Sequence, residues 1–356
     1  MAPMPPLFDG HNDCLTRLYP PGRRPLDSFL KRGETGHLDL PRALQGGLGG
    51  GIFAIFVEEG RAEGDELAFL QTRSDRFPLM DPPLDPRRAL DATLEVAHHF
   101  FQVERQAGGA LRIVRDVREL EWCLGHGVFA AVLHLEGAEA LDPDLHRLEF
   151  FFRAGVRSLG LVWSRPNAFG TGVPFQFPGS PDSGPGLTLA GRRLVRECNR
   201  LGLMLDLSHL NERGFWDVAR LSEAPLVATH SAAHALCPSA RNLTDAQLDA
   251  IARSGGVVGV NFFVGDLRPD GAMDPETPLD VLIRHVRYLA ERMGVEHVAL
   301  GSDFDGALIP TEIGDATGLP RVVRALEEAG FRGAELEGLC WRNWVRVLGE
   351  SWRPRD

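Results

Sequence analysis

The residues of this chain that could carry chemistry stand in short polar stretches, each of which directly follows an apolar run. The first is "FDGHNDCL", which places His11 and Asp13 two residues apart, with Asp9 in the same phase. Side chains at i and i+2 of an extended strand share a face, so this imidazole and these carboxylates would point together. That arrangement is a metal-ligand pattern, although a polar turn or a helix cap has the same composition.

Four further apolar runs end in the same manner. "LHLEG" places Glu136, "LDLSHL" places His209, "VATHS" places His230, and "LGSDFDG" places Asp303 and Asp305. Each stretch has an ordinary explanation, because a histidine after a strand is usually solvated or part of the core, and Asp-Gly favours a turn. Five occurrences at the same point of the pattern are harder to explain in this way than one.

Eight short apolar runs, bounded by glycine or polar residues, are predicted to be strands. They lie at Leu7–Gly10, Gly51–Val57, Val128–Leu135, Ser158–Trp163, Leu203–Ser208, Leu226–Thr229, Val257–Phe262 and Val298–Gly301. Helical spacing is predicted in the segments between most of these strands. The predicted helices are Asp91–Ala107, Leu189–Leu201, Thr244–Ser254, Pro278–Met293 and Gly333–Leu348.

Strands that alternate with helices indicate parallel βαβ units. Eight such strands predict an α/β fold, a (β/α)8 TIM barrel, formed as a single domain over residues 1–356. A doubly wound open sheet is the alternative, and the absence of a GxGxxG motif after the first strand weakens it. In a barrel the catalytic mouth lies at the carboxyl ends of the strands, which is where the five polar stretches fall.

Three histidines and three carboxylates that converge on one rim are the ligand inventory of a two-metal centre. His11, Asp13 and a carboxylate would hold one divalent ion. His209, His230 and the same carboxylate would hold the other ion.

The bridge between two such ions has to be an anion that gives one oxygen to each. A carbamylated lysine has this role in several related binuclear barrels, but the only lysine of this chain, Lys31, lies before the second predicted strand. Glu136, at the end of the third predicted strand, is therefore the predicted bridge.

Two segments interrupt the alternation and are predicted to be long loops. The first covers residues 58–88 and is polar and rich in proline, while the second covers residues 165–186 and is rich in glycine, proline and serine. Loops of this length in a compact domain are often lids or binding loops. The second loop follows a strand, so in a barrel it would lie over the catalytic mouth.

The composition excludes some classes of partner. The 356-residue chain is 44% hydrophobic and has a net charge of -11 without a run rich in lysine or arginine, which argues against nucleic acid. No apolar run approaches membrane-span length and the start lacks the layout of a signal peptide, so we expect no membrane partner. The five cysteines are scattered and odd in number, which favours a cytoplasmic location.

Taken in order, these motifs resemble the membrane dipeptidase (renal dipeptidase) family, peptidase family M19 of the amidohydrolase superfamily. The matching stretches span nearly the whole chain and are "DGHND", "HLEGAEAL", "LGLMLDLSHL", "ATHSAAHALCPSARNLTD", "GGVVGVNFF", "HVALGSDFDG" and "WRNWVRVL". The resemblance implies a (β/α)8 barrel with two Zn2+ ions per chain, although the ligand types also suit manganese, cobalt or iron. A homodimer is compatible with the family.

The resemblance also implies a role for each matching residue. The family's acidic residue after the last strand corresponds to Asp303, and its carboxylate-binding arginine corresponds to Arg241 in "PSARN". A planar guanidinium suits a carboxylate because it can donate two parallel hydrogen bonds. The implied metal ligands are the five residues already named, which are His11, Asp13, Glu136, His209 and His230.

One position departs from the family pattern. The renal enzyme and similar members carry a histidine after the fourth strand that is thought to contact the oxyanion, whereas "GLVWSRPN" places Trp163 there. An indole has one N–H donor and no basic site, so Trp163 could donate a hydrogen bond to the substrate but could not be protonated. Arg165 and Asn167 are close in sequence and are candidate substitutes.

The resemblance therefore implies a metallo-dipeptidase that cleaves free dipeptides, including those with a D-residue at the C-terminal position. Water activated between the ions would attack the peptide carbonyl, Asp303 would move a proton to the leaving amine, and Arg241 would hold the free carboxylate. Two alternatives stay open. One is an amidohydrolase that acts on another small amide, an N-acyl amino acid or a lactone, and the other is a metal-bound barrel without activity.

Overall fold

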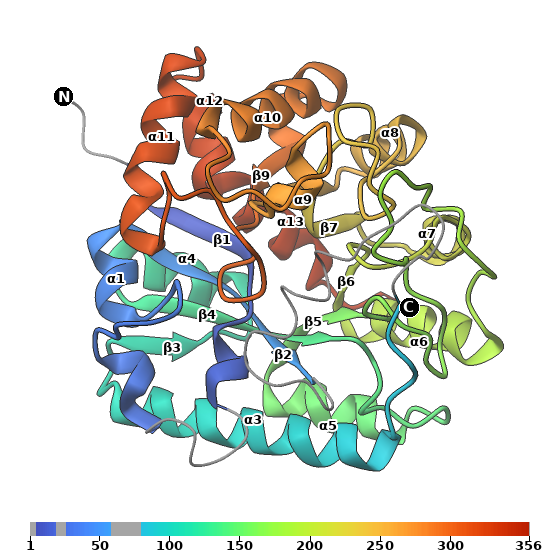
Figure 1. Cartoon of the computed structure of the whole chain (residues 1–356). Coiled ribbons are helices and arrows are strands. Elements are labelled where there is room, and N and C mark those ends of the chain that lie inside the picture. The colour runs from blue at the N-terminus through green and yellow to red at the C-terminus, as the bar shows by residue number, and fades with distance from the viewer. Residues whose placement is uncertain (1–4, 19–25, 58–79, 356) are drawn as a thin grey trace.

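The computed structural model describes residues 5–18, 26–57 and 80–355, and these residues form a nine-stranded sheet with helices around it (Figure 1). Eight of the strands follow one another as parallel neighbours. They are β1 (Leu7–Asn12), β2 (Leu48–Phe56), β4 (Phe129–Glu136), β5 (Val156–Gly160), β6 (Met204–Asp206), β7 (Val227–Ser231), β8 (Val257–Val260) and β9 (Val298–Leu300).

The first and last strands of this path meet at their carboxyl ends and close the barrel there. A parallel bridge joins Asn12 to Phe304, and the main-chain nitrogen of Asp13 donates to the carbonyl of Phe304 at 2.8 Å. The nitrogen of Asp303 donates to the carbonyl of His11 at 3.0 Å. The predicted (β/α)8 barrel is confirmed, and the alternative of an open, doubly wound sheet is wrong.

An apolar plug fills the barrel interior below the strand ends. Trp344 is fully buried, and its indole nitrogen donates to the carbonyl of Leu300 at 2.9 Å. A β-carbon at Gly10 or Gly259 would collide with Trp344 Cζ2, so β1 and β8 need glycine where the indole crosses them. The same cluster contains alternate residues of the strands, which are Phe8, Ile52, Val132, Met204, Val227, Val257 and Ala299.

Helices cover the outside of the barrel and pack their apolar faces against the strands (Figure 1). The Thr188 side chain accepts a hydrogen bond from the nitrogen of Gly191 and so caps α6, whose predicted ends are confirmed. The α-helices are α1 (Leu40–Gln45), α3 (Pro86–Gln106), α4 (Val117–His126), α5 (His146–Ala154), α6 (Leu189–Leu201), α7 (Glu212–Leu221), α8 (Asp245–Arg253), α9 (Val264–Leu267), α10 (Leu279–Met293), α11 (Leu319–Glu328), α12 (Gly333–Glu337) and α13 (Asn343–Ser351). Short 3-10 helices occur at Cys14–Leu18, Leu26–Leu30, Val295–His297 and Ala316–Gly318.

The start of α3 corrects two predicted boundaries. The helix begins at Pro86 rather than Asp91, because the Asp85 carboxylate accepts hydrogen bonds from the nitrogens of Arg87 and Arg88, both at 3.0 Å. Proline also fits the first helical turn, where its missing N–H costs nothing. The loop predicted at 58–88 therefore ends earlier than expected, and its residues 58–79 lie outside the described part of the chain.

A short strand and the C-terminal helix also differ from the prediction. Strand β3 (Leu111–Ile113) pairs with β4 beside the barrel path and was not predicted, since three residues are too few to show a periodicity. The helix predicted at Gly333–Leu348 is divided by a π-helical turn over Gly338–Arg342 into α12 and α13.

The loop predicted at 165–186 packs against the segments that follow β6 and β7. Phe169 is fully buried in the core, and Phe175 is 6% exposed. The nitrogen of Val173 donates to the carbonyl of His209 at 2.8 Å, and the nitrogen of Ala240 donates to the carbonyl of Gln176 at 3.0 Å. The loop therefore lies beside the mouth of the barrel, and its expected place over the mouth stays a prediction.

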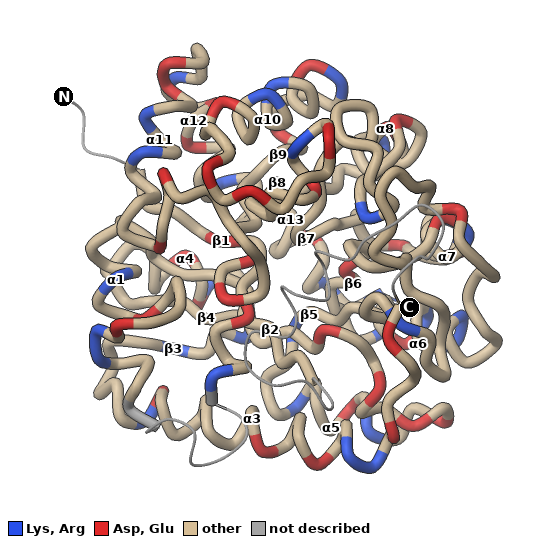
Figure 2. The backbone as a smooth tube through the Cα atoms, viewed as in Figure 1, with Lys and Arg blue, Asp and Glu red and all other residues tan. Residues whose placement is uncertain are grey.

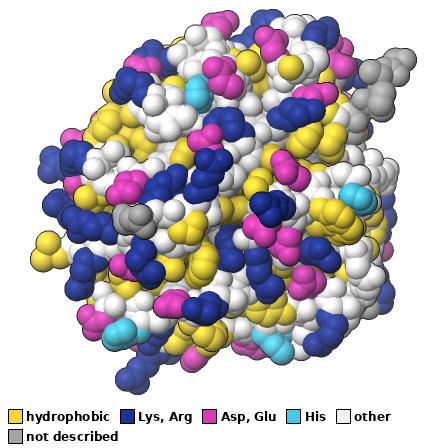
Figure 3. All heavy atoms as spheres, turned by 180° about the vertical axis from the view of Figure 1, so that it is seen from behind, with side chains coloured by type: hydrophobic (Ala, Val, Ile, Leu, Met, Phe, Trp, Pro, Cys, Tyr) yellow, Lys and Arg dark blue, Asp and Glu magenta, His cyan; other side chains and the backbone are white. Residues whose placement is uncertain are grey.

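Charged residues are distributed along the outer helices and loops (Figure 2). On the face seen from behind, lysine and arginine side chains are interleaved with aspartate and glutamate (Figure 3). Within the residues that the structure describes, no helix combines the length and apolar character needed to cross a membrane.

Candidate metal centre and active site

The structure brings the five predicted ligands together at the mouth of the barrel. They come from the ends of four strands, which are β1, β4, β6 and β7, and each side chain is buried. Exposure of the whole residue is 0% for His11, 5% for Asp13, 5% for Glu136, 6% for His209 and 1% for His230.

Glu136 lies at the centre of this cluster. Its Oε1 atom is 3.1 Å from the Nε2 atom of His209, 3.6 Å from that of His11 and 3.7 Å from that of His230. Two groups of possible ligand atoms share this carboxylate, namely Glu136 with His209 and His230, and Glu136 with His11 and Asp13. Within each group the ligand atoms lie no more than 4.8 Å apart, a spacing that suits a pair of cations with a common carboxylate.

Two of the imidazoles are held in the form that binds a metal. Burial lowers the pKa of His209 well below its usual value, and the guanidinium of Arg241 lowers it further. The pKa of His230 is also well below its usual value, first because of burial and then because of the charge of His11. Both rings are therefore neutral and carry a lone pair on one nitrogen.

The carboxylates of Glu136 and Asp13, together with His11, form a part of the cluster that a positive charge would stabilise. Burial opposes charging of His11, but the carboxylates of Glu136 and Asp13 outweigh it and hold the pKa of His11 well above its usual value. Burial and the charge of Glu136 raise the pKa of Asp13 to about 6. These carboxylates thus compete for protons, which a bound cation would replace.

Two buried ligand atoms support this interpretation directly. Nε2 of His11 and Oδ1 of Asp13 have no hydrogen-bond partner among the described residues. Buried polar atoms almost always have a hydrogen-bond partner, so two atoms without one in a cluster of imidazoles and carboxylates fit a divalent cation.

Asp303 follows β9 and lies beside this cluster, half-buried. Its Oδ2 atom accepts a hydrogen bond from Nδ2 of Asn261 at 3.0 Å. Burial and the charge of Asp13 raise the pKa of Asp303 to about 8. A group of possible ligand atoms joins Asp303 to His11 and His230, so this carboxyl can reach atoms held at the centre.

Arg241 is buried next to the ligands from β6 and β7. One terminal nitrogen donates to the carbonyl of Ser208, and the other lies 3.3 Å from Nε2 of His209. The hydroxyl of Ser239, which accepts from the main-chain nitrogen of Arg241, donates to Asp266 at 2.7 Å. A guanidinium therefore lies at the edge of the cluster, next to His209.

Trp163 forms an aromatic wall on the same side. Its ring centroid is 5.6 Å from that of His209, 5.4 Å from that of Phe175 and 4.9 Å from that of Phe56. Phe263 belongs to the same small apolar cluster. The position predicted from "GLVWSRPN" is therefore adjacent to the candidate centre.

The two candidate substitutes near Trp163, Asn167 and Arg165, form hydrogen bonds and ion pairs away from the cluster. Nδ2 of Asn167 donates to the carbonyl of Leu161 at 2.8 Å, and its Oδ1 accepts from the nitrogen of Phe169 at 2.8 Å. Arg165 is buried in an ion pair with Glu139 at 2.8 Å. Asn167 holds its own loop, and its predicted contact with substrate stays a prediction.

Asp206 was missed from the sequence because it was treated as part of an apolar strand. It is buried beneath the cluster, and its carboxylate accepts hydrogen bonds from Ser208 and Thr229. His134, whose Nε2 lies 3.7 Å from Asp206 Oδ2, belongs to the same buried layer. An acidic residue inside "LMLDLS" was the available signal, since buried carboxylates rarely occur without a partner.

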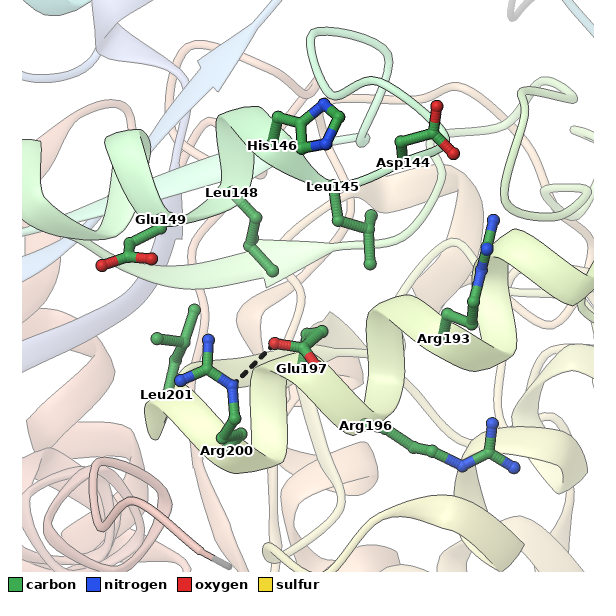
Figure 4. A pocket seen from close by; sticks show the side chains of 10 residues that line it. All are labelled: Asp144, Leu145, His146, Leu148, Glu149, Arg193, Arg196, Glu197, Arg200 and Leu201. Carbon is green, nitrogen blue, oxygen red and sulfur yellow. Dashed lines mark hydrogen bonds and ion pairs between the residues drawn. The ribbon is translucent and has the colours of Figure 1, made fainter.

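A groove of about 490 Å³ lies outside the barrel between α5 and α6 (Figure 4). The ion pair between Arg200 and Glu197, 2.7 Å apart, lies on its α6 side. The groove shares no residue with the cluster at the barrel mouth, so it is separate from the candidate site.

A parallel barrel with imidazoles and carboxylates clustered at the carboxyl ends of its strands has the architecture of a metal-dependent hydrolase. A family model described as membrane dipeptidase (peptidase family M19) matches residues 2–353. The chain therefore belongs to the membrane dipeptidase family.

Solved structures agree with this membership. A metallopeptidase from Rhodobacter sphaeroides, liganded with a phosphinate mimic of the dipeptide L-Ala-D-Ala, is 48% identical, has a TM-score of 0.95, and the match covers 98% of this chain and 100% of that chain. A family M19 metallopeptidase named dipeptidase AC is 49% identical, has a TM-score of 0.92, and the match covers 98% of this chain and 99% of that chain.

A relative found by sequence agrees as well. An uncharacterized protein from the pqqA 5′ region of Klebsiella pneumoniae is 51% identical over 252 residues, which is 71% of this chain and 93% of that protein.

Proposed function

We propose that this chain is a binuclear zinc dipeptidase that hydrolyses the peptide bond of free dipeptides, including those with a D-residue at the C-terminal position. The observation that carries the proposal is the position of Glu136 Oε1, which lies within 3.7 Å of Nε2 atoms from both predicted ligand sets. An unmodified glutamate at that point is suited to bridge two cations.

The proposed ligands are the five clustered residues, with His11 and Asp13 at one ion, His209 and His230 at the other, and Glu136 between them. Two Zn2+ ions, when bound, would polarise the peptide carbonyl and lower the pKa of the attacking water.

The chain's own groups would perform the remaining steps. Asp303 would accept a proton from the attacking water and pass it to the leaving amine, a role for which its carboxyl is placed within reach of the ligand atoms of His11 and His230. Arg241 would hold the terminal carboxylate of the substrate, which restricts cleavage to short peptides. Trp163, beside His209, would contact the substrate from the aromatic wall.

The comparisons support a dipeptide as the substrate. The Rhodobacter protein that resembles this chain over its full length carries a mimic of L-Ala-D-Ala, which contains a D-residue at the C-terminal position. We therefore extend both the dipeptide and the tolerance for a D-residue to this chain as part of the proposal.

The decisive experiment is kinetic profiling of metal-depleted and zinc-reloaded protein against libraries of L-Xaa-L-Xaa and L-Xaa-D-Xaa dipeptides. Zinc should restore turnover of both libraries, and elemental analysis should find two zinc ions per chain. Full zinc content without turnover of any dipeptide would favour an inactive barrel. A single zinc per active chain would contradict the binuclear centre.

A second candidate activity rests on Trp163, which cannot be protonated where a histidine would be available to the oxyanion. A lactone has a better leaving group than an amide and depends less on a proton donor near the oxyanion, and an N-acyl amino acid presents the same amide and terminal carboxylate as a dipeptide. These compounds belong in the same assay, and a kcat/KM that exceeds the value for every dipeptide would replace the proposed peptidase activity with this one.

The cellular setting belongs to the proposal as well. The scattered cysteines favour the cytoplasm, and the family is compatible with a homodimer. Cell fractionation and sedimentation of the purified protein test these two points.

A further inference from the structure

A buried polar layer lies between the candidate metal centre and the apolar plug of the barrel. Its central residue is Asp206, which ends β6 and is 4% exposed. Oδ1 of Asp206 accepts hydrogen bonds from the nitrogen of Ser208 at 3.1 Å, from the hydroxyl of Ser208 at 2.6 Å and from the nitrogen of Thr229 at 2.8 Å. Its Oδ2 atom is 2.6 Å from the hydroxyl of Thr229.

The hydroxyl of Thr229 connects this carboxylate to two of the proposed ligands. Oγ1 of Thr229 lies 2.9 Å from Nδ1 of His230 and 3.4 Å from Nδ1 of His11. These two rings belong to different ions of the proposed centre. One threonine therefore contacts the far side of one imidazole from each ligand set.

The direction of these hydrogen bonds follows from counting protons. A hydroxyl has one hydrogen and two lone pairs, and an ionised carboxylate can only accept. Thr229 must therefore give its hydrogen to Asp206 and accept at the imidazoles. The Nδ1 atoms of His230 and His11 must therefore each carry a proton. This leaves the lone pair of each ring at Nε2, the atom that faces Glu136.

We infer that Asp206 is a positioning residue that acts through Thr229 to fix the tautomer and the ring orientation of His230 and His11. The inference rests on the proposed function, because it assumes that these rings bind metal through Nε2. Outer partners of this kind orient metal-binding histidines, and their loss weakens metal binding by about 10- to 100-fold. His209 is held separately, since Ser164 Oγ lies 2.9 Å from its Nδ1.

Substitutions at Thr229 separate this role from simple packing. Thr229→Val keeps the shape but removes the hydroxyl, whereas Thr229→Ser keeps the hydroxyl but removes a methyl group. Ser158→Ala is the matched control, because it deletes another buried hydroxyl of the layer whose contact, at 2.8 Å, is with Nδ1 of His134 rather than with a proposed ligand.

Asp206→Asn gives the sharpest contrast. The side-chain oxygen would stay at the Oδ1 position, where three donors meet, so the new NH2 group would face Thr229. The hydroxyl would then accept from the amide and donate to His230, which selects the tautomer with a proton at Nε2. This nearly isosteric change should disturb metal binding at least as strongly as Thr229→Val.

The test measures the zinc affinity of metal-depleted protein by competition with a chromophoric chelator, together with the visible absorption of the cobalt-loaded protein. Thr229→Val and Asp206→Asn should weaken zinc binding by about 10- to 100-fold and change the cobalt spectrum, while Thr229→Ser and Ser158→Ala should resemble wild type. Should Asp206→Asn fail to fold, the Thr229 pair decides the outcome.

Wild-type affinity and an unchanged spectrum in Thr229→Val would overturn the inference, and so would equal losses in Thr229→Val and Thr229→Ser. Wild-type protein that binds zinc but cleaves no dipeptide would overturn only the proposed function, since the affinities still report on positioning. Wild-type protein that takes up no zinc would overturn both.

Discussion

Asp303 combines an unusual backbone conformation with a raised pKa. Its backbone lies in the left-handed region, with φ of 58°, which residues other than glycine seldom adopt. The main chain is held there by the carbonyl of His11, and the side chain is held by Asn261. Backbone strain that the surroundings maintain in this way is concentrated at functional sites, and here it places the Asp303 carboxyl beside the candidate ligands.

Replacing this carboxyl should separate catalysis from metal binding. Asp303→Asn keeps the size of the side chain and tolerates the left-handed backbone, but it cannot exchange a proton. We expect kcat to fall by a factor on the order of a hundred or more, while zinc content is unchanged. Steady-state kinetics with elemental analysis measures both, and retained activity would rule out Asp303 as the proton shuttle.

Arg241 should act on binding rather than on the chemical step. Arg241→Ala removes the guanidinium that would hold the substrate carboxylate, so KM for free dipeptides should rise about tenfold or more, with a smaller effect on C-terminally amidated dipeptides. Kinetics on matched free and amidated substrates gives the comparison. Equal losses on both substrates would refute the carboxylate clamp.

The site residues that could be predicted from the sequence are those that stand at the ends of predicted strands. His11, Glu136 and His230 were identified because a polar residue that follows an apolar run has a definite place in a parallel barrel. Asp206 was missed because it lies inside the predicted strand Leu203–Ser208, and its partner Thr229 comes from a different part of the chain. Hydrogen bonds between distant residues leave no local pattern in a sequence.

At the scale of elements, the segment after β9 determines where the Asp303 carboxyl lies. Asp305 points away from the centre, since its carboxylate pairs with Arg17 at 2.7 Å and accepts from the nitrogen of His37 at 2.6 Å. The nitrogen of Gly306 donates to the carbonyl of Asp303 at 3.1 Å. The segment is thus tied to the N-terminal part of the chain on one side and faces the metal cluster on the other.

Gly306 should not tolerate a side chain, for steric reasons. A β-carbon there would overlap Oδ2 of Asp13 and come within 2.6 Å of Oδ1 of Asp303. Gly306→Ala should therefore weaken zinc binding and lower kcat by about tenfold or more, with little change in secondary structure. Chelator competition, kinetics and circular dichroism test this together.

Gly125 provides the control for that substitution. It lies in α4, and a β-carbon at this position would meet no atom within 4 Å. Gly125→Ala should leave zinc affinity and kcat unchanged and should raise stability by about 0.5–1 kcal/mol, because alanine favours a helix over glycine. Equal activity losses in both variants would show that the effect at Gly306 is not steric.

The strands could be predicted because burial on both faces requires a nearly continuous apolar run in the sequence, even where the run is short. All eight barrel strands were located in this way, with ends shifted by a few residues, because hydrogen bonds rather than hydrophobicity set the ends of a strand. Helices α1, α4, α5, α7 and α11 were not predicted. Asp116 before α4 and Gly127 after it are typical capping residues and were an available signal.

At the scale of the whole molecule, the candidate centre ties together strands that are far apart in the chain. Ligands from β1, β4, β6 and β7 meet at one point, and β1 also meets the segment after β9 there. Cations bound to these ligands would act as cross-links at the open end of the barrel. Binding that occurs only in the folded state stabilises that state.

Metal removal should therefore lower the melting temperature, and the loss should grow with pH. In the metal-free fold, the pKa of Asp303 is about 8, against 3.8 for an ordinary aspartate, and the pKa of His11 is also raised. From about pH 7 to about pH 8, the folded state holds protons that the unfolded state has released, so stability falls as pH rises. His209 and His230, with lowered pKa values, are neutral in both states over this range and do not oppose the trend.

Scanning calorimetry of zinc-loaded and chelator-treated protein at the two ends of this pH range measures the effect. The loaded protein should show the smaller pH dependence, because cations replace the protons. A metal-free protein whose melting temperature rises with pH over this range would contradict the assignment.

Lys31 is exposed and is the only lysine of the chain, so the proposed bridge can be a carboxylate that the gene encodes directly. A carbamate bridge would require a lysine to react with dissolved carbon dioxide before the two ions could bind. Reconstitution with Glu136 needs no such gas, and we expect loading to proceed equally well in degassed buffer and in bicarbonate.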